Sequence, residues 1–237
     1  PKANFCDKTG TLWIAKFPAA EDDRDIGAWE GVTWWLARQA GIDMPLAKVE
    51  RLGQGGHHTF CIQRFDRTAA KDEKPERRRF YASAMTLLGK DISEGTSYLE
   101  LAEFLARRGD PEHIHVDLEQ LFRRVVFNIV VGNRDDHLRN HGFILGKKGW
   151  RLAPAFDVNP SIDKATHVLN IDDIDNRPSL ETVLATAAFY RLTPKRAKEM
   201  IDGIVNVVAE WKAVARRAKI AAADIELSAS AFSALEL

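Results

Sequence analysis

A periodic apolar stretch in the middle of the chain is the feature that most constrains the fold. In "DLEQLFRRVVFNIVVG" (117–132) the apolar residues recur with the spacing of one helix face, at Leu118, Leu121, Phe122, Val125, Val126, Ile129 and Val130. This spacing predicts a helix buried along that face. We expect Gly132 to end it, because glycine readily takes the left-handed conformation that closes a helix. The residues that follow should therefore emerge beside the core.

The residues after this helix form a polar loop and then a hairpin. The loop "NRDDHLRNH" holds two aspartates, two histidines and two asparagines. Beyond it, "HGFIL", "GKKG" and "WRLAPAFD" are typical of a strand, a turn and a second strand, and the second strand leads to Asp157. The sequence thus predicts carboxylates and amides at one place next to the buried helix.

The first third of the chain predicts a small sheet with one helix packed on it. "TLWIAKFP" is strand-like, and "DIGAWEGVTWWLARQAG" has helical length and should end at Gly41. Residues 46–52 and 58–66 predict two more strands, joined as a hairpin by the turn "GQGG". Three tryptophans of the helix are expected to pack it against the sheet: Trp29, Trp34 and Trp35.

Helical patterns dominate the rest of the chain. Residues 66–79 hold ten charged residues in fourteen, which predicts a solvated connection. "FYASAMTLLG", "SYLELAEFLARRG" and the segments from about Ser179 onward then predict helices. We therefore expect an α+β fold of two lobes. Residues 1–66 would form a small β-rich N-lobe with one helix, and residues 67–237 a larger, mostly helical C-lobe.

Composition excludes several classes of protein. Lysine and arginine together number 34, as do aspartate and glutamate, so no net positive charge favours direct binding to nucleic acid. Cys6 and Cys61 are too few for a disulfide framework, which favours a reducing cytoplasm. The chain has neither an apolar run of membrane-spanning length nor a signal region. These observations predict a cytoplasmic protein without a membrane partner.

The spacing of the polar loop matches the chemistry of phosphate transfer. In kinases a catalytic-loop Asp accepts the substrate hydroxyl proton, an Asn four intervening residues later binds magnesium, and a later Asp binds it again. Asp135 and Asn140 have that gap, whereas Asp136 would leave only three residues. Asp157 follows the hairpin, where the second carboxylate is needed. Carboxylate and amide oxygens suit magnesium, which would arrive with ATP.

The N-terminal strands offer the other parts of a nucleotide site. Lys16 stands between apolar neighbours on the strand "WIAKFP", a suitable position for a phosphate-binding cation. Glu30 on the following helix could hold Lys16 in place, although an exposed surface glutamate is the simpler interpretation. Backbone groups from Gln63 to Phe65 could bind adenine between the lobes, and Phe65 could equally be a core residue.

These residues resemble the HipA-like serine/threonine kinases, the toxins of bacterial toxin–antitoxin pairs. The resemblance covers nearly the whole chain. It rests on "PKANF", "WIAKFP", "AWEGVTWWLARQAGI", "MPLAKVERL", "IQRFDR", "GNRDDHLRNHGF" and "LAPAFDVNPS". The catalytic-loop pattern taken together with "LAPAFD" makes chance similarity improbable.

The resemblance implies a two-lobed protein-kinase-like fold with ATP and Mg²⁺ as cofactors. Asp135 would be the catalytic base, Asn140 and Asp157 the magnesium ligands, and Lys16 the main phosphate-binding lysine. Lys2 would be a second nucleotide contact. The implied partners are a protein substrate, such as glutamate-tRNA ligase or another translation component, and a HipB-like DNA-binding antitoxin.

The chain also departs from this family. The family's loop before Pro1, with its autophosphorylated serine, and the small antitoxin-contacting subdomain do not occur in this sequence, which begins without Met. We therefore expect a fragment that is weak or inactive as a kinase. Asp157 is followed by Val158 and Asn159 and not by the Phe-Gly of eukaryotic kinases, so their activation mechanism is not expected.

Other interpretations stay open. His137 and His141 suggest a zinc site, but Gly132 ends the helix before them, so support of the loop is the simpler role. The same apparatus could serve a small-molecule or lipid phosphotransferase, or a non-catalytic nucleotide- or antitoxin-binding module. The acidic segment 170–178 lies where a substrate or activation loop would lie and does not discriminate between the two kinds of enzyme.

Overall fold

A four-stranded antiparallel sheet forms the N-terminal part of the protein. The computed structural model describes residues 1–52, 56–68 and 77–235. The strands lie in the order β1-β2-β4-β3 and comprise β1 (Lys2–Cys6), β2 (Leu12–Lys16), β4 (Thr59–Gln63) and β3 (Ala47–Glu50). The sequence did not predict β1. Its register pairs Lys2 with Lys16, so two of the predicted nucleotide contacts are cross-strand neighbours.

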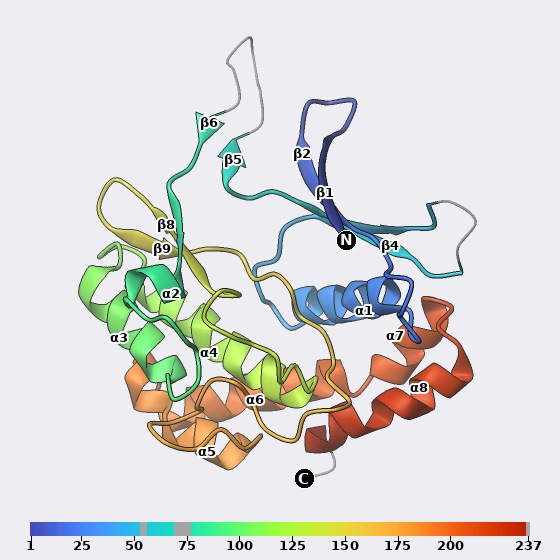
Figure 1. Cartoon of the computed structure of the whole chain (residues 1–237). Helices are drawn as coiled ribbons and strands as arrows, with labels where there is room; N and C mark the ends of the chain where they lie inside the picture. Colours follow the sequence, from blue (N-terminus) through green and yellow to red (C-terminus); the bar gives the residue numbers. More distant parts are fainter. Residues whose placement is uncertain (53–55, 69–76, 236–237) are drawn as a thin grey trace.

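Helix α1 (Ile26–Gln39) lies between this sheet and the C-terminal helices (Figure 1). It begins where the Asp25 carboxylate accepts a hydrogen bond from the backbone N–H of Ala28, as N-cap residues do. Gly41 lies just beyond its end with φ of +75°, as the sequence predicted.

Two of the three tryptophans of this helix make ring contacts with the C-terminal helices, which the sequence did not predict. Trp29 is buried against the rings of Trp211 and Phe232, with centroid distances of 6.1 and 6.3 Å. Trp35 lies under the guanidinium group of Arg217. Both therefore join α1 to the C-terminal helices. The sequence alone could not show which face of α1 packs on the sheet and which face packs on the C-terminal helices, because those helices lie far along the chain.

The helical part is built around α4 (Ile114–Val130), the helix predicted from apolar spacing (Figure 1). All seven of the apolar residues that predicted it are fully buried. The surrounding helices are α3 (Tyr98–Arg108), α5 (Leu180–Ala185), η1 (Ala187–Tyr190), α6 (Pro194–Val208), α7 (Trp211–Arg217), α8 (Ala222–Ser228) and η2 (Ala229–Leu235). Helix α6 begins at a side-chain cap, since the Thr193 side chain accepts a hydrogen bond from the backbone N–H of Arg196.

The predicted helix over "FYASAMTLLG" was wrong in its first half. Residues Tyr81–Ser83 form strand β7, and only Ala84–Leu87 form helix α2. Strand β7 pairs with β8 (Gly142–Leu145), which pairs with β9 (Trp150–Leu152). The predicted hairpin β8-β9 is confirmed. Tyr81–Ser83 are extended because a strand about sixty residues away supplies their hydrogen bonds, which local helical spacing does not reveal.

The charged connection contains a short ladder. Strand β5 (Arg67–Thr68) pairs with β6 (Arg77–Arg78), and the two project away from the body (Figure 1). The centre of the predicted connection, residues 69–76, and most of the predicted "GQGG" turn, residues 53–55, lie outside the described residues. The division of the chain at residue 66 stays a prediction. Within the described residues, no helix is long and apolar enough to cross a membrane.

Gly132, at the end of α4, is expected to tolerate no side chain. Its φ is +66°, and a Cβ atom there would lie 2.1 Å from the carbonyl oxygen of Ala231. Gly132→Ala should therefore lower the free energy of unfolding by roughly 2–4 kcal/mol. In contrast, Gly203 lies inside α6 with nothing within 4 Å of its Cβ direction, so Gly203→Ala should raise stability by about 0.5–1 kcal/mol. Urea unfolding of the two variants tests this, and equal effects would refute the steric argument.

Candidate functional site

A cavity of about 260 Å³ lies between the sheet and the segment that ends at Asp157. One part of its wall is apolar or aromatic and comprises Ile14, Pro45, Ile62, Phe65, Tyr81 and Phe156. The other part is polar or charged and comprises Lys2, Lys16, Gln63, Arg64, Asp66 and Asp157. An apolar wall next to a charged one suits a ligand with a flat apolar ring and an ionised group.

Lys16 is the centre of the charged part. Its ammonium group contacts Glu30 on α1 and donates a hydrogen bond to Asp157 Oδ1 at 2.8 Å. Lys2, from the neighbouring strand, lies 3.5 Å from the other oxygen of Asp157. Glu30 is only 4% exposed, so its interpretation as a surface residue was wrong. The alternative interpretation, that Glu30 holds Lys16 in place, agrees with their contact between α1 and β2.

The charge states in this group follow from its environment. Burial works to lower the pKa of Lys16, but the charges of Glu30 and Asp157 outweigh burial and raise it. Burial works to raise the pKa of Asp157, but Lys16 and Lys2 outweigh it, and the pKa falls below its ordinary value. Burial raises the pKa of Glu30. At neutral pH we therefore expect a charged Lys16 and an ionised Asp157.

The aromatic wall lies at the predicted adenine-binding segment. The ring of Phe65 meets Tyr81 edge-on at 5.5 Å and lies 5.6 Å from Phe156. The backbone N–H of Gln63 donates to Leu46, and the N–H of Arg64 donates to Leu12. Among these three residues, only the N–H of Phe65 has no backbone hydrogen bond to a described residue. Of these three N–H groups, that of Phe65 is the one left for a ligand, and adenine binding by backbone groups of Gln63 to Phe65 stays a prediction.

The catalytic-loop residues form a second group. The carboxylate of Asp135 is exposed and contacts the ammonium group of Lys164 through Oδ1. The Asn140 side-chain nitrogen donates to the carbonyl oxygen of Asp135 at 3.5 Å. Within the described residues, the side-chain oxygen of Asn140 accepts no hydrogen bond, so it is available to a cation. The Asn140 side chain thus contacts the backbone of Asp135, and the roles assigned to the two residues stay predictions.

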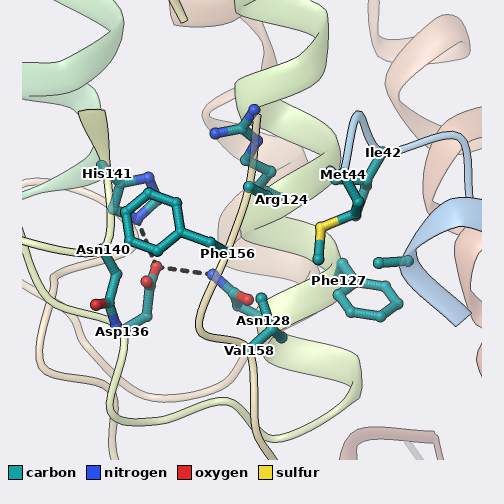
Figure 2. Close-up of a pocket in the computed structure, with 12 residues that line it drawn as sticks. Ile42, Met44, Arg124, Phe127, Asn128, Asp136, Asn140, His141, Phe156 and Val158 are labelled. Carbon is teal, nitrogen blue, oxygen red and sulfur yellow. Dashed lines mark hydrogen bonds and ion pairs between the residues drawn. The ribbon is translucent and has the colours of Figure 1, made fainter. Parts of the chain in front are cut away.

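Asp136 has a different role from its neighbour. It is 3% exposed, and its Oδ2 accepts hydrogen bonds from Tyr98 at 2.6 Å and Asn128 at 2.7 Å. His141 Nε2 lies 2.6 Å from the same oxygen (Figure 2). Burial works to raise the pKa of Asp136, but the nearby His141 and the hydrogen bonds outweigh it and lower the pKa. The prediction that Asp136 and His141 support the loop is consistent with these contacts.

The space shown in Figure 2 is too small for a nucleotide. It lies among α4, the catalytic loop and Phe156, and has a volume of about 10 Å³, room for roughly one water molecule. Arg124 borders it, donates to the Ala153 carbonyl at 2.6 Å and has a buried Nε without a partner among the described residues. We therefore expect the nucleotide in the larger cavity beside Lys16 and not in this space.

The structure joins most, but not all, of the predicted site residues. Lys2, Lys16, Gln63, Phe65 and Asp157 line one cavity. Asp135 and Asn140 contact each other, and no hydrogen bond or ion pair of the described residues links them directly to Asp157.

Sequence reasoning missed several residues of the site, namely Tyr81, Phe156 and Lys164. Phe156 could have been found from its place beside Asp157, whereas Tyr81 and Lys164 carried no local signal. Among the described residues, His137 and His141 do not belong to any group close enough to bind a metal ion.

The buried His167 should make stability depend on pH. It is 2% exposed, and burial lowers its pKa from 6.5 to about 4. Below about pH 6.5 the unfolded chain binds a proton at this histidine that the folded protein does not bind. The free energy of unfolding therefore falls as the pH drops toward 4. The loss should reach about 2–3 kcal/mol near pH 4.5. Urea unfolding across this range should show a smaller pH dependence for His167→Leu than for wild type or for the exposed control His115→Leu, and an unchanged dependence would refute the assignment.

Comparison with known sequences identifies related proteins. The sequence model of the HipA-like C-terminal domain matches residues 1–211. A Haemophilus influenzae protein provisionally named as a kinase is 30% identical over 150 residues, which are 59% of this chain and 43% of that protein. The serine/threonine-protein kinase toxin HipA of Shewanella oneidensis is 28% identical over 171 residues, which are 65% of this chain and 38% of the toxin. The chain thus spans about two fifths of the length of these curated relatives.

Two solved structures share the fold. A HipA chain from the Shewanella oneidensis complex of HipA, HipB and operator DNA matches with a TM-score of 0.73 and 19% identity, over 99% of this chain and 62% of that one. The Helicobacter pylori proinflammatory kinase CtkA matches with a TM-score of 0.55 and 14% identity, over 100% of this chain and 95% of that one. These likenesses confirm the predicted α+β kinase-like fold. The chain therefore belongs to the HipA-like C-terminal domain family.

Proposed function

We propose that this chain carries the catalytic centre of a HipA-like serine/threonine protein kinase, which transfers the γ-phosphate of ATP to a protein hydroxyl with magnesium. The observation that carries the proposal is the position of Lys16. A charged lysine is held between Glu30 and Asp157 beside a cavity with an aromatic wall. In kinases this arrangement orients the phosphates of ATP at the lysine.

Each residue of the site has a separate proposed role in the reaction. The aromatic wall at Phe65 would hold the adenine ring, and the ammonium groups of Lys2 and Lys16 would bind phosphate oxygens. The substrate hydroxyl would approach Asp135, which takes its proton while the hydroxyl oxygen bonds to the γ-phosphorus. The bond between that phosphorus and the bridging oxygen breaks, and ADP leaves with the electron pair.

The donor set fits a magnesium ion. Asp157 offers an ionised carboxylate to which two ammonium groups are already drawn, and Asn140 offers an unengaged amide oxygen. Hard oxygen ligands of this kind suit Mg²⁺. When bound, the ion would neutralise phosphate charge. Lys2 and Lys16 would then be free to turn from Asp157 toward the phosphates.

The partners follow from the family relationship. The Shewanella HipA structure was determined with HipB and operator DNA, which supports a HipB-like antitoxin as a partner. The substrate would be a protein hydroxyl, with glutamate-tRNA ligase or another translation component as candidates. The near-zero net charge supports contact with DNA only through such a partner.

The test is transfer of labelled phosphate. The complete protein that contains this chain is incubated with Mg²⁺, γ-labelled ATP and a bacterial lysate, and labelled proteins are identified by mass spectrometry. We expect label on a seryl or threonyl residue, and no label when Lys16→Met replaces wild type. Label that appears only in lipids or small molecules would favour another phosphotransferase. Absence of any magnesium-dependent transfer would overturn the proposal.

A further inference from the structure

Lys164 makes a contact that the proposed roles do not use. Its ammonium group contacts Oδ1 of Asp135, although Lys164 lies 29 residues further along the chain. It belongs to the segment after Asp157 and was not singled out by any sequence pattern. An exposed ion pair contributes little to stability on average, so the contact needs support from the surrounding structure before a role is assigned.

That support comes from Arg134, which directly precedes Asp135. The Arg134 side chain is 6% exposed and donates hydrogen bonds to the carbonyl of Lys164 at 2.9 Å and to that of Ser161 at 3.3 Å. The Arg134 backbone N–H donates to the Ser161 hydroxyl at 3.2 Å, and its carbonyl accepts from Val168 at 3.2 Å. The backbone of Lys164 is thus hydrogen-bonded to Arg134, the residue next to the proposed base.

The contact leaves Asp135 able to react. Lys164 occupies Oδ1, and Oδ2 accepts no hydrogen bond from the described residues. A substrate hydroxyl can therefore approach Oδ2 while Lys164 stays at Oδ1. The phosphorus that bonds to this hydroxyl would then lie on the side of the carboxylate where the Lys164 ammonium group is held.

The other lysines of the site are engaged elsewhere. Lys2 and Lys16 contact Asp157 and line the nucleotide cavity, whereas Lys164 contacts the carboxylate where the hydroxyl arrives. A phosphoryl group in transfer carries negative charge on its outer oxygens, and a cation placed there stabilises the transition state. Among the described lysines that make ion pairs, Lys164 alone contacts Asp135.

We propose that Lys164 is a catalytic residue of this reaction, a conclusion that rests on the proposed kinase function. It contacts the transferring phosphoryl group and neutralises its outer oxygens. The bond from hydroxyl oxygen to phosphorus forms, the bond from phosphorus to ADP breaks with the electron pair on ADP, and the hydroxyl proton passes to Asp135. Lys164 keeps its own proton throughout.

The test compares Lys164→Met, Lys164→Arg and the control Lys147→Met. Lys147 is exposed in the turn between β8 and β9, away from the loop. We expect Lys164→Met to lower kcat roughly 100-fold with little change in KM for ATP, and Lys164→Arg to restore much of the rate. The control should match wild type. An unchanged or raised kcat in Lys164→Met would overturn the proposal, because a lysine that only blocks the base would give that result.

A binding measurement separates this inference from the kinase proposal. Mg²⁺ and ADP are titrated with and without aluminium fluoride, which imitates the transferring phosphoryl group. Wild type should bind ADP more tightly with the fluoride, and Lys164→Met should lose that gain while binding ADP alone normally. If wild type transfers phosphate but the variants match it in both kcat and the gain in ADP affinity with fluoride, only the proposed role of Lys164 is refuted. If wild type neither transfers phosphate nor binds nucleotide, the function and the inference fall together.

Discussion

Asp135→Asn should lower the rate of phosphate transfer by about 100- to 10,000-fold, because a carboxamide cannot take the proton of the substrate hydroxyl. The side chain keeps its size and shape. The Asp135 carboxylate is 62% exposed, so the substitution should leave the fold and the binding of magnesium and ATP nearly unchanged. A radiolabel assay measures the rate, and calorimetry measures nucleotide binding on the same preparations.

The matched control is Asp163→Asn, an exposed aspartate in the segment that carries Lys164. We expect it to keep the wild-type rate. If Asp135→Asn and Asp163→Asn transfer phosphate equally well, Asp135 is not the base. Loss of ATP binding by Asp135→Asn would instead show that the carboxylate is needed to bind ATP before the transfer step.

The second large effect concerns the metal. Asp157→Asn should weaken the binding of ATP in the presence of magnesium by roughly 10- to 100-fold or more, because it removes the charged ligand of the site. The same variant should bind ATP without magnesium about as well as wild type does, since Lys16 and Lys2 would be released from Asp157. Calorimetric titration with and without magnesium gives both affinities.

The pH dependence supplies a further check on Asp157. Its pKa is lowered by Lys16 and Lys2, so the carboxylate is ionised at neutral pH and becomes protonated only as the pH falls through that lowered value. Magnesium dependence should thus be constant near neutral pH in wild type. Asp173→Asn, which changes an exposed aspartate of the acidic segment, should behave as wild type does. Equal affinity with and without the metal in wild type would remove Asp157 from its proposed role.

Local spacing predicted those parts of the site that lie within one stretch of chain. Asp135 and Asn140 contact each other because only four residues separate them in a tight loop, and the burial of Asp136 fits its exclusion as the base. The α4 helix was predicted for a similar reason, since the apolar residues of its buried face recur with the spacing of a helix. The fold class followed from these elements and from the resemblance.

Residue spacing could not predict contacts between segments that lie far apart in the chain. Tyr81 was assigned to a helix because its partner strand β8 lies far along the chain. Glu30 was given two interpretations, an exposed residue or a partner of Lys16, because spacing along the chain does not show whether β2 reaches α1. Lys164 lies in a polar segment without periodicity, and hydrogen bonds from Arg134, a residue far from it in the chain, help to place it beside Asp135.

The attachment of α1 has a consequence for how such a protein could be switched. The Thr33 hydroxyl donates to the carbonyl of Val158 at 2.5 Å, and Trp29 lies against Trp211. The helix that carries Glu30 is therefore anchored to the segment that carries Asp157, and a swing of α1 would have to separate packed aromatic rings. Any separation of β2 from α1 and from the segment of Asp157 would withdraw Lys16 from Glu30 and Asp157 together, so the contacts of this one lysine would distinguish a closed site from an open one.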